Sequence, residues 1–195
     1  MSITTDDNQN RIEAIFFPYA TERIAKVRES KTRFVHYTSA EVAMQIISGQ
    51  EVWMRNATTM NDYMEVTHGS ECLRKAYAGA NGQKLKQTID ALFPGLSGEL
   101  ESRFNAWLPG LRYDTYLTCI SEHCDSEDKH GRLSMWRAYG GSTGVALVLN
   151  SAAFVTESNA LKAYTSPVSY LDSDTFTEEF RRLTDTLNGE INFVK

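Results

Sequence analysis

A short strand–helix–strand pattern constrains the fold of this chain more than any other feature of its sequence. Residues 33–37 read Arg-Phe-Val-His-Tyr and favour a β-strand. Thr38 and Glu41 then have the spacing of a helix capping box, and Gly49 is of the type that often follows the last turn of a helix. Residues 51–55 predict a second strand. A chain with this pattern needs at least one β-sheet beside its helices.

Hydrophobic spacing predicts further elements that do not alternate regularly. Helical spacing occurs at residues 11–30 (with a break at Pro18), 62–108, 134–139 and 173–187, and strand patterns occur at 113–121, 145–149 and 162–171. We therefore expect an α+β fold with a central mixed sheet of short strands and a helical insertion at 62–108. Within the insertion, Asn81-Gly82 and Pro94-Gly95 are the expected breaks. Residues 1–10 are expected to form a flexible leader, and 11–195 a single domain.

Composition narrows the class of protein. The chain has 20 Lys and Arg against 25 Asp and Glu, a formal net charge of −5, which does not favour a nucleic-acid partner. No apolar stretch is long enough for a membrane helix, and the polar N-terminal sequence is unlike a signal peptide. Three cysteines are an odd number without a disulfide pattern. We expect a cytoplasmic protein with no membrane partner.

The first candidate site residues follow from the end of the predicted first strand. His36, Tyr37 and Thr38 could donate hydrogen bonds to a ligand lying over a sheet. The alternative is that His36 packs in the protein and Thr38 only caps a helix. The sequence contains no phosphate-binding glycine loop with its lysine, no nucleophile elbow and no paired CxxC motif that would decide between them.

The next candidates surround the second predicted strand. Arg55 at its end could face an anionic ligand group, with Asn61 and Glu65 in the wall of the same pocket. Asn61 or Asp62 could instead cap a helix, and Glu65 would then favour the positive end of that helix. Both interpretations stay open.

A third group combines cysteines, histidines and acids. Cys119, His123, Cys124 and His130 loosely suggest a metal site but lack the paired spacing of zinc ligands, so we expect no metal. Cys124 shows no neighbouring base that would make it a nucleophile. The acids at 125–128 are clustered in one polar loop, which is more typical of a solvated surface than of a nuclease.

The fourth group precedes the strand at 145–149. Trp136 or Tyr139 could stack on a flat ring, and Arg137 could bind phosphate. Gly140, Gly141 and Gly144 would then let the backbone approach a ligand, although they could equally form a simple turn.

Taken in order, these blocks resemble the bacterial domain-of-unknown-function family 2971. The resemblance spans about residues 33–170 and rests on the blocks His36-Tyr37-Thr38-Ser39, Val52-Trp53-Met54-Arg55, Met60-Asn61-Asp62 with Glu65, Cys119-Ile120-Ser121, Met135-Trp136-Arg137-Ala138-Tyr139, Gly144-Val145-Ala146-Leu147 and Val168-Ser169-Tyr170. Each block is short, but their order and spacing together are specific. The family name implies no activity.

The opening His36-Tyr37-Thr38 is also similar to ADP-ribosyltransferases of the histidine-tyrosine-glutamate class. That likeness implies that His36 contacts the ribose of NAD with Tyr37 or Thr38 beside it, and that Arg55 serves a phosphate. The class also uses a late glutamate. Here the chain ends at Lys195, about where an acidic-x-acidic-x-Arg segment would begin in the family of unknown function. If that motif carries the catalytic carboxylate, the chain is inactive, truncated or completed by another subunit.

Two functions follow from the sequence. The first is an NAD-binding, ADP-ribosyltransferase-like or glycohydrolase-like enzyme. Its catalytic residues would be His36 and Glu65, and its cofactor-binding residues Tyr37, Thr38, Arg55, Asn61, Trp136, Arg137 and Tyr139. The alternative is a non-catalytic protein-interaction module of a phage or defence system, using the insertion at 62–108 and aromatics such as Trp107. The partner is thus a small nucleotide ligand or another protein.

Overall fold

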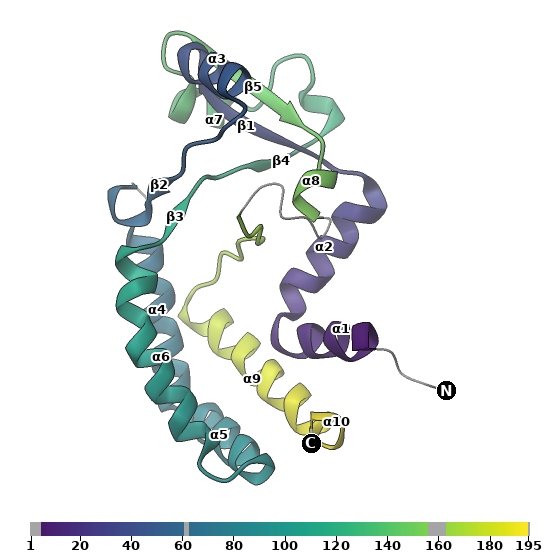
Figure 1. Cartoon of the computed structure of the whole chain (residues 1–195), viewed down its shortest axis with the longest axis vertical. Helices are drawn as coiled ribbons and strands as arrows, with labels where there is room; N and C mark the ends of the chain where they lie inside the picture. Colours follow the sequence, from purple (N-terminus) through teal and green to yellow (C-terminus); the bar gives the residue numbers. More distant parts are fainter. Residues whose placement is uncertain (1–4, 61–62, 156–162, 195) are drawn as a thin grey trace. The chain divides into compact units, whose positions relative to one another are not determined.

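Figure 1 shows the computed structural model, which describes residues 5–60, 63–155 and 163–194. The chain is α+β, as the sequence predicts, and it folds into two units. The helical unit comprises Met1–Thr21, Asn56–Tyr116 and Val168–Lys195, and the sheet unit comprises Glu22–Arg55 and Leu117–Pro167.

The sheet unit is built on strand β1 (Arg33–Ser39), which lies between β4 (Ser121–His123) and β5 (Gly144–Leu149). Both neighbours run antiparallel to β1, so the mixed sheet that we expected is wrong for this sheet. The sheet would have been mixed if residues 51–55 had formed a strand that ran parallel to β1. Instead only β2 (Arg55–Asn56) is a strand there, and it pairs with β3 (Tyr116–Leu117).

Alternation along β1 separates its side chains between two faces. In the register with β5, His36 is opposite Leu147 and Thr38 is opposite Val145. Phe34, His36 and Thr38 therefore share one face of the sheet, and Tyr37 points to the other. The strand prediction at 145–149 is confirmed by β5.

Two helices cover the Phe34 end of this face. Helix α2 (Pro18–Ser30) contributes Val27, and α8 (Ala152–Val155) contributes Val155, to a cluster around Phe34. The Phe154 ring meets the Phe34 ring edge-on at a centroid distance of 5.4 Å.

Helix α3 (Ala40–Gly49) follows β1 directly, and its caps differ from the expectation by one residue at each end. The N-cap is Ser39, whose side chain accepts a hydrogen bond from the Val42 backbone N–H, so Thr38 is not the cap. The residue with left-handed backbone after the helix is Gln50, with φ 54°.

The helical unit confirms the predicted helical insertion. It contains α1 (Thr5–Phe16), α4 (Tyr63–Ala78), α5 (Ala80–Leu92), α6 (Leu96–Tyr113), α9 (Ser173–Gly189), α10 (Ile191–Val194) and the short 3-10 turn η1 (Ala57–Thr59). Its core holds Ile15, Ala76, Leu85, Phe180 and Leu187. Helix α1 starts inside the segment expected to be a leader. No helix among the described residues is long and apolar enough to cross a membrane.

One predicted break in the insertion is right and the other is wrong. The chain turns at Pro94-Gly95, where Gly95 has φ 83°. Asn81-Gly82 instead lies inside α5. A Cβ on Gly82 would come within 1.8 Å of the Tyr77 carbonyl oxygen, so this glycine permits close packing rather than ending a helix.

Of the remaining helices and strands predicted from the sequence, some are confirmed and others are wrong. The helical turn at 134–139 is confirmed by α7 (Leu133–Met135) and the π-helical turn η3 (Trp136–Gly140), and α9 confirms the last helix. The strand predicted at 113–121 is reduced to β3 and β4, since α6 continues to Tyr113. The strand predicted at 162–171 is wrong over 163–171, which has no regular structure.

Candidate functional site

His36 is the predicted site residue whose ring the protein orients most clearly. It is half-buried on β1, and its Nδ1 lies 3.0 Å from the Cys119 carbonyl oxygen. Because a carbonyl oxygen only accepts, Nδ1 carries the proton in this bond. In the neutral ring, Nε2 is then left as a hydrogen-bond acceptor. Thr38, also half-buried, lies two residues along on the same face.

Tyr37 and Trp136 are brought together, but as packing residues on the opposite face of β1. Their rings meet edge-on at 4.7 Å, and Tyr37 is only 4% exposed. The Tyr37 hydroxyl accepts a hydrogen bond of 2.8 Å from the Arg132 backbone N–H. The Trp136 Nε1–H donates to the His130 carbonyl oxygen at 2.7 Å. Their geometry is that of a structural cluster, with His36 on the other side of the sheet.

Glycines near this aromatic pair are explained by close packing. Gly131 has φ 63°, and a Cβ there would lie 2.6 Å from Trp136 Nε1 and 2.9 Å from the Tyr37 hydroxyl oxygen. A Cβ on Gly144 would come within 2.7 Å of the Gly140 Cα. The turn alone therefore accounts for Gly140 and Gly144, and no close ligand is needed to explain them.

Three other predicted residues remain exposed. Arg137 and Tyr139 lie on η3, and Tyr139 is 51% exposed. Arg55 is exposed on β2. Among the described residues, no carboxylate forms an ion pair with Arg55 or Arg137, and no hydrogen bond links either arginine to His36. Both cations are thus accessible to an anionic group.

The two remaining predicted residues are placed only in part. Glu65 lies near the start of α4 in the helical unit, whereas His36 belongs to the sheet unit. The position of the Glu65 side chain and all of Asn61 fall outside the described part of the chain.

An ion-pair network that we did not predict holds the loop between β4 and α7. Arg33 on β1 pairs with Asp125 at 2.6 Å and with Asp128 at 2.9 Å. His123 Nε2 is 2.8 Å from the Asp128 carboxylate, and His123 is 5% exposed. The hydrogen bond from His123, aided by Arg33, lowers the pKa of Asp128 below its ordinary value. This polar loop, which includes the 3-10 turn η2 (Asp125–Glu127), is therefore tied to β1 by ion pairs, while Asp125 and Asp128 stay exposed to solvent, as the sequence predicts.

The same network reaches the aromatic cluster through Arg132. Its Nε donates to Glu127 at 2.9 Å, and this hydrogen bond lowers the pKa of Glu127. The backbone N–H of Arg132 is the donor to the Tyr37 hydroxyl. The acidic loop thereby fixes Arg132, whose backbone N–H bonds to Tyr37.

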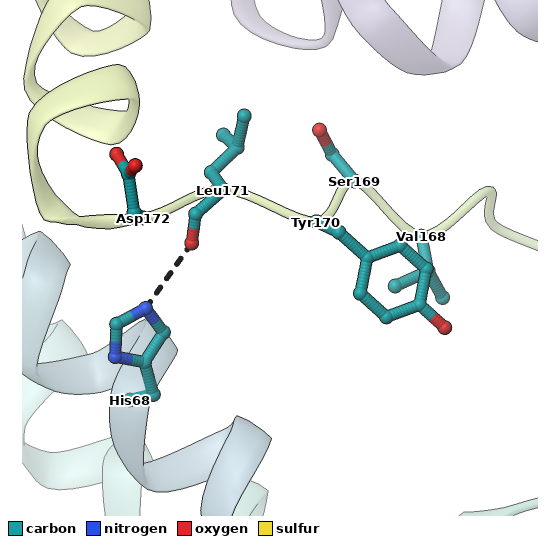
Figure 2. A pocket seen from close by; sticks show the side chains of 6 residues that line it. All are labelled: His68, Val168, Ser169, Tyr170, Leu171 and Asp172. Atoms are coloured by element: carbon teal, nitrogen blue, oxygen red, sulfur yellow. Dashed lines mark hydrogen bonds between the residues drawn. The ribbon is translucent and has the colours of Figure 1, made fainter.

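The helical unit contains a separate hollow of about 460 Å³, which the sequence did not reveal. Figure 2 shows His68 facing the segment that lines it, Val168–Asp172. His68 Nε2 donates to the Leu171 carbonyl oxygen at 3.1 Å, as the dashed line marks. Cys72 Sγ is 3.5 Å from the same nitrogen but is 5% exposed. Because Nε2 carries its proton toward Leu171, it is not a base for the Cys72 thiol.

A comparison with known protein families finds a match for one part of the chain. Met135, the π-helical turn, β5 and α9 follow one another in the second half of the sequence. Residues 135–193 match the family model described as a protein of unknown function (DUF2971). This match confirms the DUF2971 resemblance for that segment, which contains Trp136, Arg137 and Tyr139. No curated protein matches the chain, and no solved structure does.

Proposed function

We propose that the sheet unit binds a nucleotide such as NAD on the face of β1 that carries His36. The orientation of the His36 ring is the observation that supports this proposal. The bond from Nδ1 to the Cys119 carbonyl oxygen holds the ring and leaves Nε2 for a second partner. A ribose hydroxyl is a suitable donor to that nitrogen, and the Thr38 hydroxyl on the same face can add a hydrogen bond.

An exposed arginine of the sheet unit suits the rest of such a ligand. A guanidinium group binds a diphosphate with two parallel hydrogen bonds, which the exposed Arg55 can offer because no described carboxylate pairs with it. Arg137 and Tyr139 lie on η3, whose Trp136 packs against the other face of β1, so we do not assign them to a ligand beside His36. In this proposal Tyr37 and Trp136 do not contact the ligand. They hold β1 in place, since their polar atoms already bond to the protein.

The proposed chemistry is that of an ADP-ribosyltransferase-like or glycohydrolase-like enzyme. The bond between nicotinamide and ribose breaks through a transition state with positive charge on the ribose, which a carboxylate stabilises. Glu65, which the sequence predicted for this role, belongs to the helical unit, so the structure of the sheet unit assigns no carboxylate and the role of Glu65 is left to the variant below. The DUF2971 match leaves the reaction unassigned, because the family is one of unknown function.

Calorimetric titration of the whole chain with NAD and with ADP-ribose tests this proposal. We expect binding of both ligands and a dissociation constant at least about tenfold weaker for His36→Ala, a change of about 1.4 kcal/mol. His68→Ala is the matched control, since His68 is an exposed histidine of the helical unit. Equal binding by wild type and His36→Ala, or no binding of either ligand, would overturn the proposal.

Glu65→Gln separates binding from chemistry. If Glu65 acts on the ribosyl cation, this variant should bind NAD like the wild type but release nicotinamide at least about a hundredfold more slowly. Release of nicotinamide is followed by chromatography. An unchanged rate would remove Glu65 from the proposed mechanism and leave the binding site intact.

A second candidate function, a protein-interaction module of a phage or defence system, is favoured by α6. Trp107 is 64% exposed and Leu100 is 44% exposed, and their spacing of seven residues places them on one side of the helix. A photo-crosslinking residue at position 107 should capture one specific protein in cells that contain the chain. The same residue at the exposed Asn105 is the control. Identical products from both positions would contradict this function.

A further inference from the structure

The sheet unit contains a buried histidine whose two ring nitrogens differ in their hydrogen bonds. His123 lies on β4 opposite Arg33 of β1, and its side chain is 3% exposed. Its Nε2 is 2.8 Å from the Asp128 carboxylate. Its Nδ1 is buried and has no hydrogen-bond partner in the part of the chain that the structure describes. A buried polar atom without a partner costs free energy, so this nitrogen requires an explanation.

The bond to Asp128 decides which ring nitrogen carries the proton. The hydrogen bond from His123 lowers the pKa of Asp128, so its carboxylate is ionised at neutral pH and can only accept. Nε2 is therefore the donor, and the neutral ring is left with a lone pair on Nδ1. Glu127 Oε2, another acceptor, lies 3.6 Å from this Nδ1. A proton on Nδ1 would supply the donor that these two atoms lack.

Glu127 can accept from a protonated Nδ1 without losing its present bonds. Its Oε1 accepts from Arg132 Nε at 2.9 Å, and its Oε2 accepts from the Cys124 backbone N–H at 3.3 Å. A carboxylate oxygen has two lone pairs, so Oε2 retains one acceptor position. A charge-assisted hydrogen bond is about 2.7–2.9 Å long, which is shorter than the present separation. Forming it would therefore draw the turn η2 toward β4.

The charges around His123 balance only when the ring is protonated. The ion-pair network contains three carboxylates and two guanidinium groups, which belong to Asp125, Glu127, Asp128, Arg33 and Arg132. With a neutral ring, this network therefore has one negative charge in excess. A proton on His123 removes that excess and places the new positive charge between two carboxylates.

The other charged groups of the neighbouring elements lie outside this network. Three of them are exposed, namely Lys129 and His130 in the loop and Arg137 on η3. Glu122 of β4 forms an ion pair with Arg23 of α2. On β1, Tyr37 lies on the same face as Arg33, and its hydroxyl accepts from the Arg132 backbone N–H.

We propose that His123 is a pH-sensitive switch that closes the loop between β4 and α7. With a neutral ring, only Nε2 holds the loop to His123, through Asp128. With a protonated ring, Nδ1 also donates to Glu127. Because Glu127 holds Arg132, whose N–H bonds to Tyr37, the change reaches the strand that carries His36. This proposal does not rest on nucleotide binding, and its test needs no ligand.

Nuclear magnetic resonance of the whole chain with ¹⁵N-labelled histidine tests the two states of the ring. At about pH 8, His123 should carry a proton on Nε2 and a lone pair on Nδ1, and at about pH 5 both nitrogens should be protonated. Glu127 and Asp128 have lowered pKa values, so both stay ionised over this range. A proton on Nδ1 at the higher pH, or a ring that stays neutral at the lower pH, would overturn the proposal.

Hydrogen exchange tests whether the proton closes the loop. The amides of Glu127, Gly131 and Arg132 donate hydrogen bonds in this region and serve as reporters. If the closed loop binds the proton more tightly than the open loop, their protection factors should rise at least about threefold between about pH 8 and about pH 5. Unchanged or falling protection over this range would overturn the proposal.

Variants assign the effect to one histidine. His123→Gln keeps an amide donor for Asp128 but cannot be protonated, so the rise in protection should disappear. His130→Gln is the matched control, since His130 is an exposed histidine of the same loop, and the rise should remain. A rise that persists in His123→Gln, or that disappears equally in His130→Gln, would overturn the proposal. If circular dichroism shows that His123→Gln is unfolded, the ¹⁵N titration of the wild type decides.

Glu127→Gln tests the carboxylate that receives the new bond. This variant should lower protection at every pH, because the bond to Arg132 weakens, and it should also reduce the rise toward lower pH. A merely structural role of Glu127 would change the level of protection and leave the size of the rise intact, which would overturn the assignment of Glu127 as the acceptor.

Discussion

The sheet unit and the helical unit differ in the way they hold their charged residues. In the sheet unit, Arg33 is paired with Asp125 and Asp128, which lie far away in the sequence, and Asp128 also bonds to the buried His123. In the helical unit, several pairs connect residues one turn apart on a single helix, as Arg181 does with Glu178, beside pairs between helices such as Lys84 with Asp185. Pairs of the second kind stabilise a helix locally, whereas the first kind fixes a loop against a sheet.

This difference indicates where a rigid site can form. The network in the sheet unit positions the loop whose Arg132 backbone N–H holds Tyr37, the residue next to His36. The hollow of the helical unit is lined by a segment without regular structure, 168–172. A ligand-binding geometry that requires fixed side chains is therefore better supported in the sheet unit.

The largest expected effect tests whether the two cores are separate. Leu187 is 1% exposed in the helical core, and Leu187→Ala should lower the free energy of unfolding of that unit by about 2–5 kcal/mol. Hydrogen exchange should show lost protection in α5 and α9, with β1 and β5 unchanged. Val35→Ala, at an equally buried position of the sheet unit, should give the reverse pattern. Equal loss in both units from either variant would contradict two separate cores.

The next effect tests the aromatic cluster of the sheet unit. Gly131→Ala adds a methyl group against Trp136 and Tyr37 at a residue with φ 63°, so it should destabilise this unit by about 1–3 kcal/mol. The near-ultraviolet circular dichroism of the tryptophan should change. Gly141→Ala is the control, because Gly141 also has positive φ but an added Cβ would meet no atom within 4 Å. The same loss in both variants would mean that backbone strain alone matters.

A smaller effect tests the start of α3. Ser39→Ala removes the acceptor for the Val42 N–H and should cost about 1 kcal/mol, measured by urea unfolding. Thr38→Ala should cost less, since Ser39 and not Thr38 caps the helix. The opposite ranking would restore the cap that the sequence pattern predicted.

The smallest of the expected effects is the loss of stability of the loop at 122–132 in acid. Because His123 and Arg33 lower the pKa of Asp128 in the folded protein, its contribution to stability is present above the ordinary carboxylate range. It is lost as the pH falls below the unfolded value near 4 and through the folded pKa. The hydrogen-exchange protection factors of the loop at 122–132, which correct for the slower intrinsic exchange in acid, should therefore fall as the pH is lowered through this range. Asp128→Asn should flatten this dependence, whereas Glu29→Gln should leave it unchanged.

Sequence patterns predicted the elements that depend on local information. The helices at 173–189 and in the insertion, and the strand at 144–149, follow from side-chain spacing, turn residues and continuous apolar character. The segments at 51–55 and 163–171 have similar β-forming residues, yet most of them form no strand. A strand exists only where another backbone completes its hydrogen bonds, and the sequence of one segment does not say which segment that will be.

The candidate site likewise combines features that follow from local sequence with features that depend on the tertiary structure. The sequence by itself determined that His36 and Tyr37, as neighbours on a strand, point to opposite faces, and that Arg137 and Tyr139 lie on a helical turn. Only the tertiary structure decided that Tyr37 packs on Trp136, that Cys119 orients His36, and that Arg33 joins the acidic loop. These contacts connect residues more than eighty positions apart in the chain, as the His36–Cys119 bond does with a separation of 83. They depend on how the whole sheet unit folds, and no local pattern encodes them.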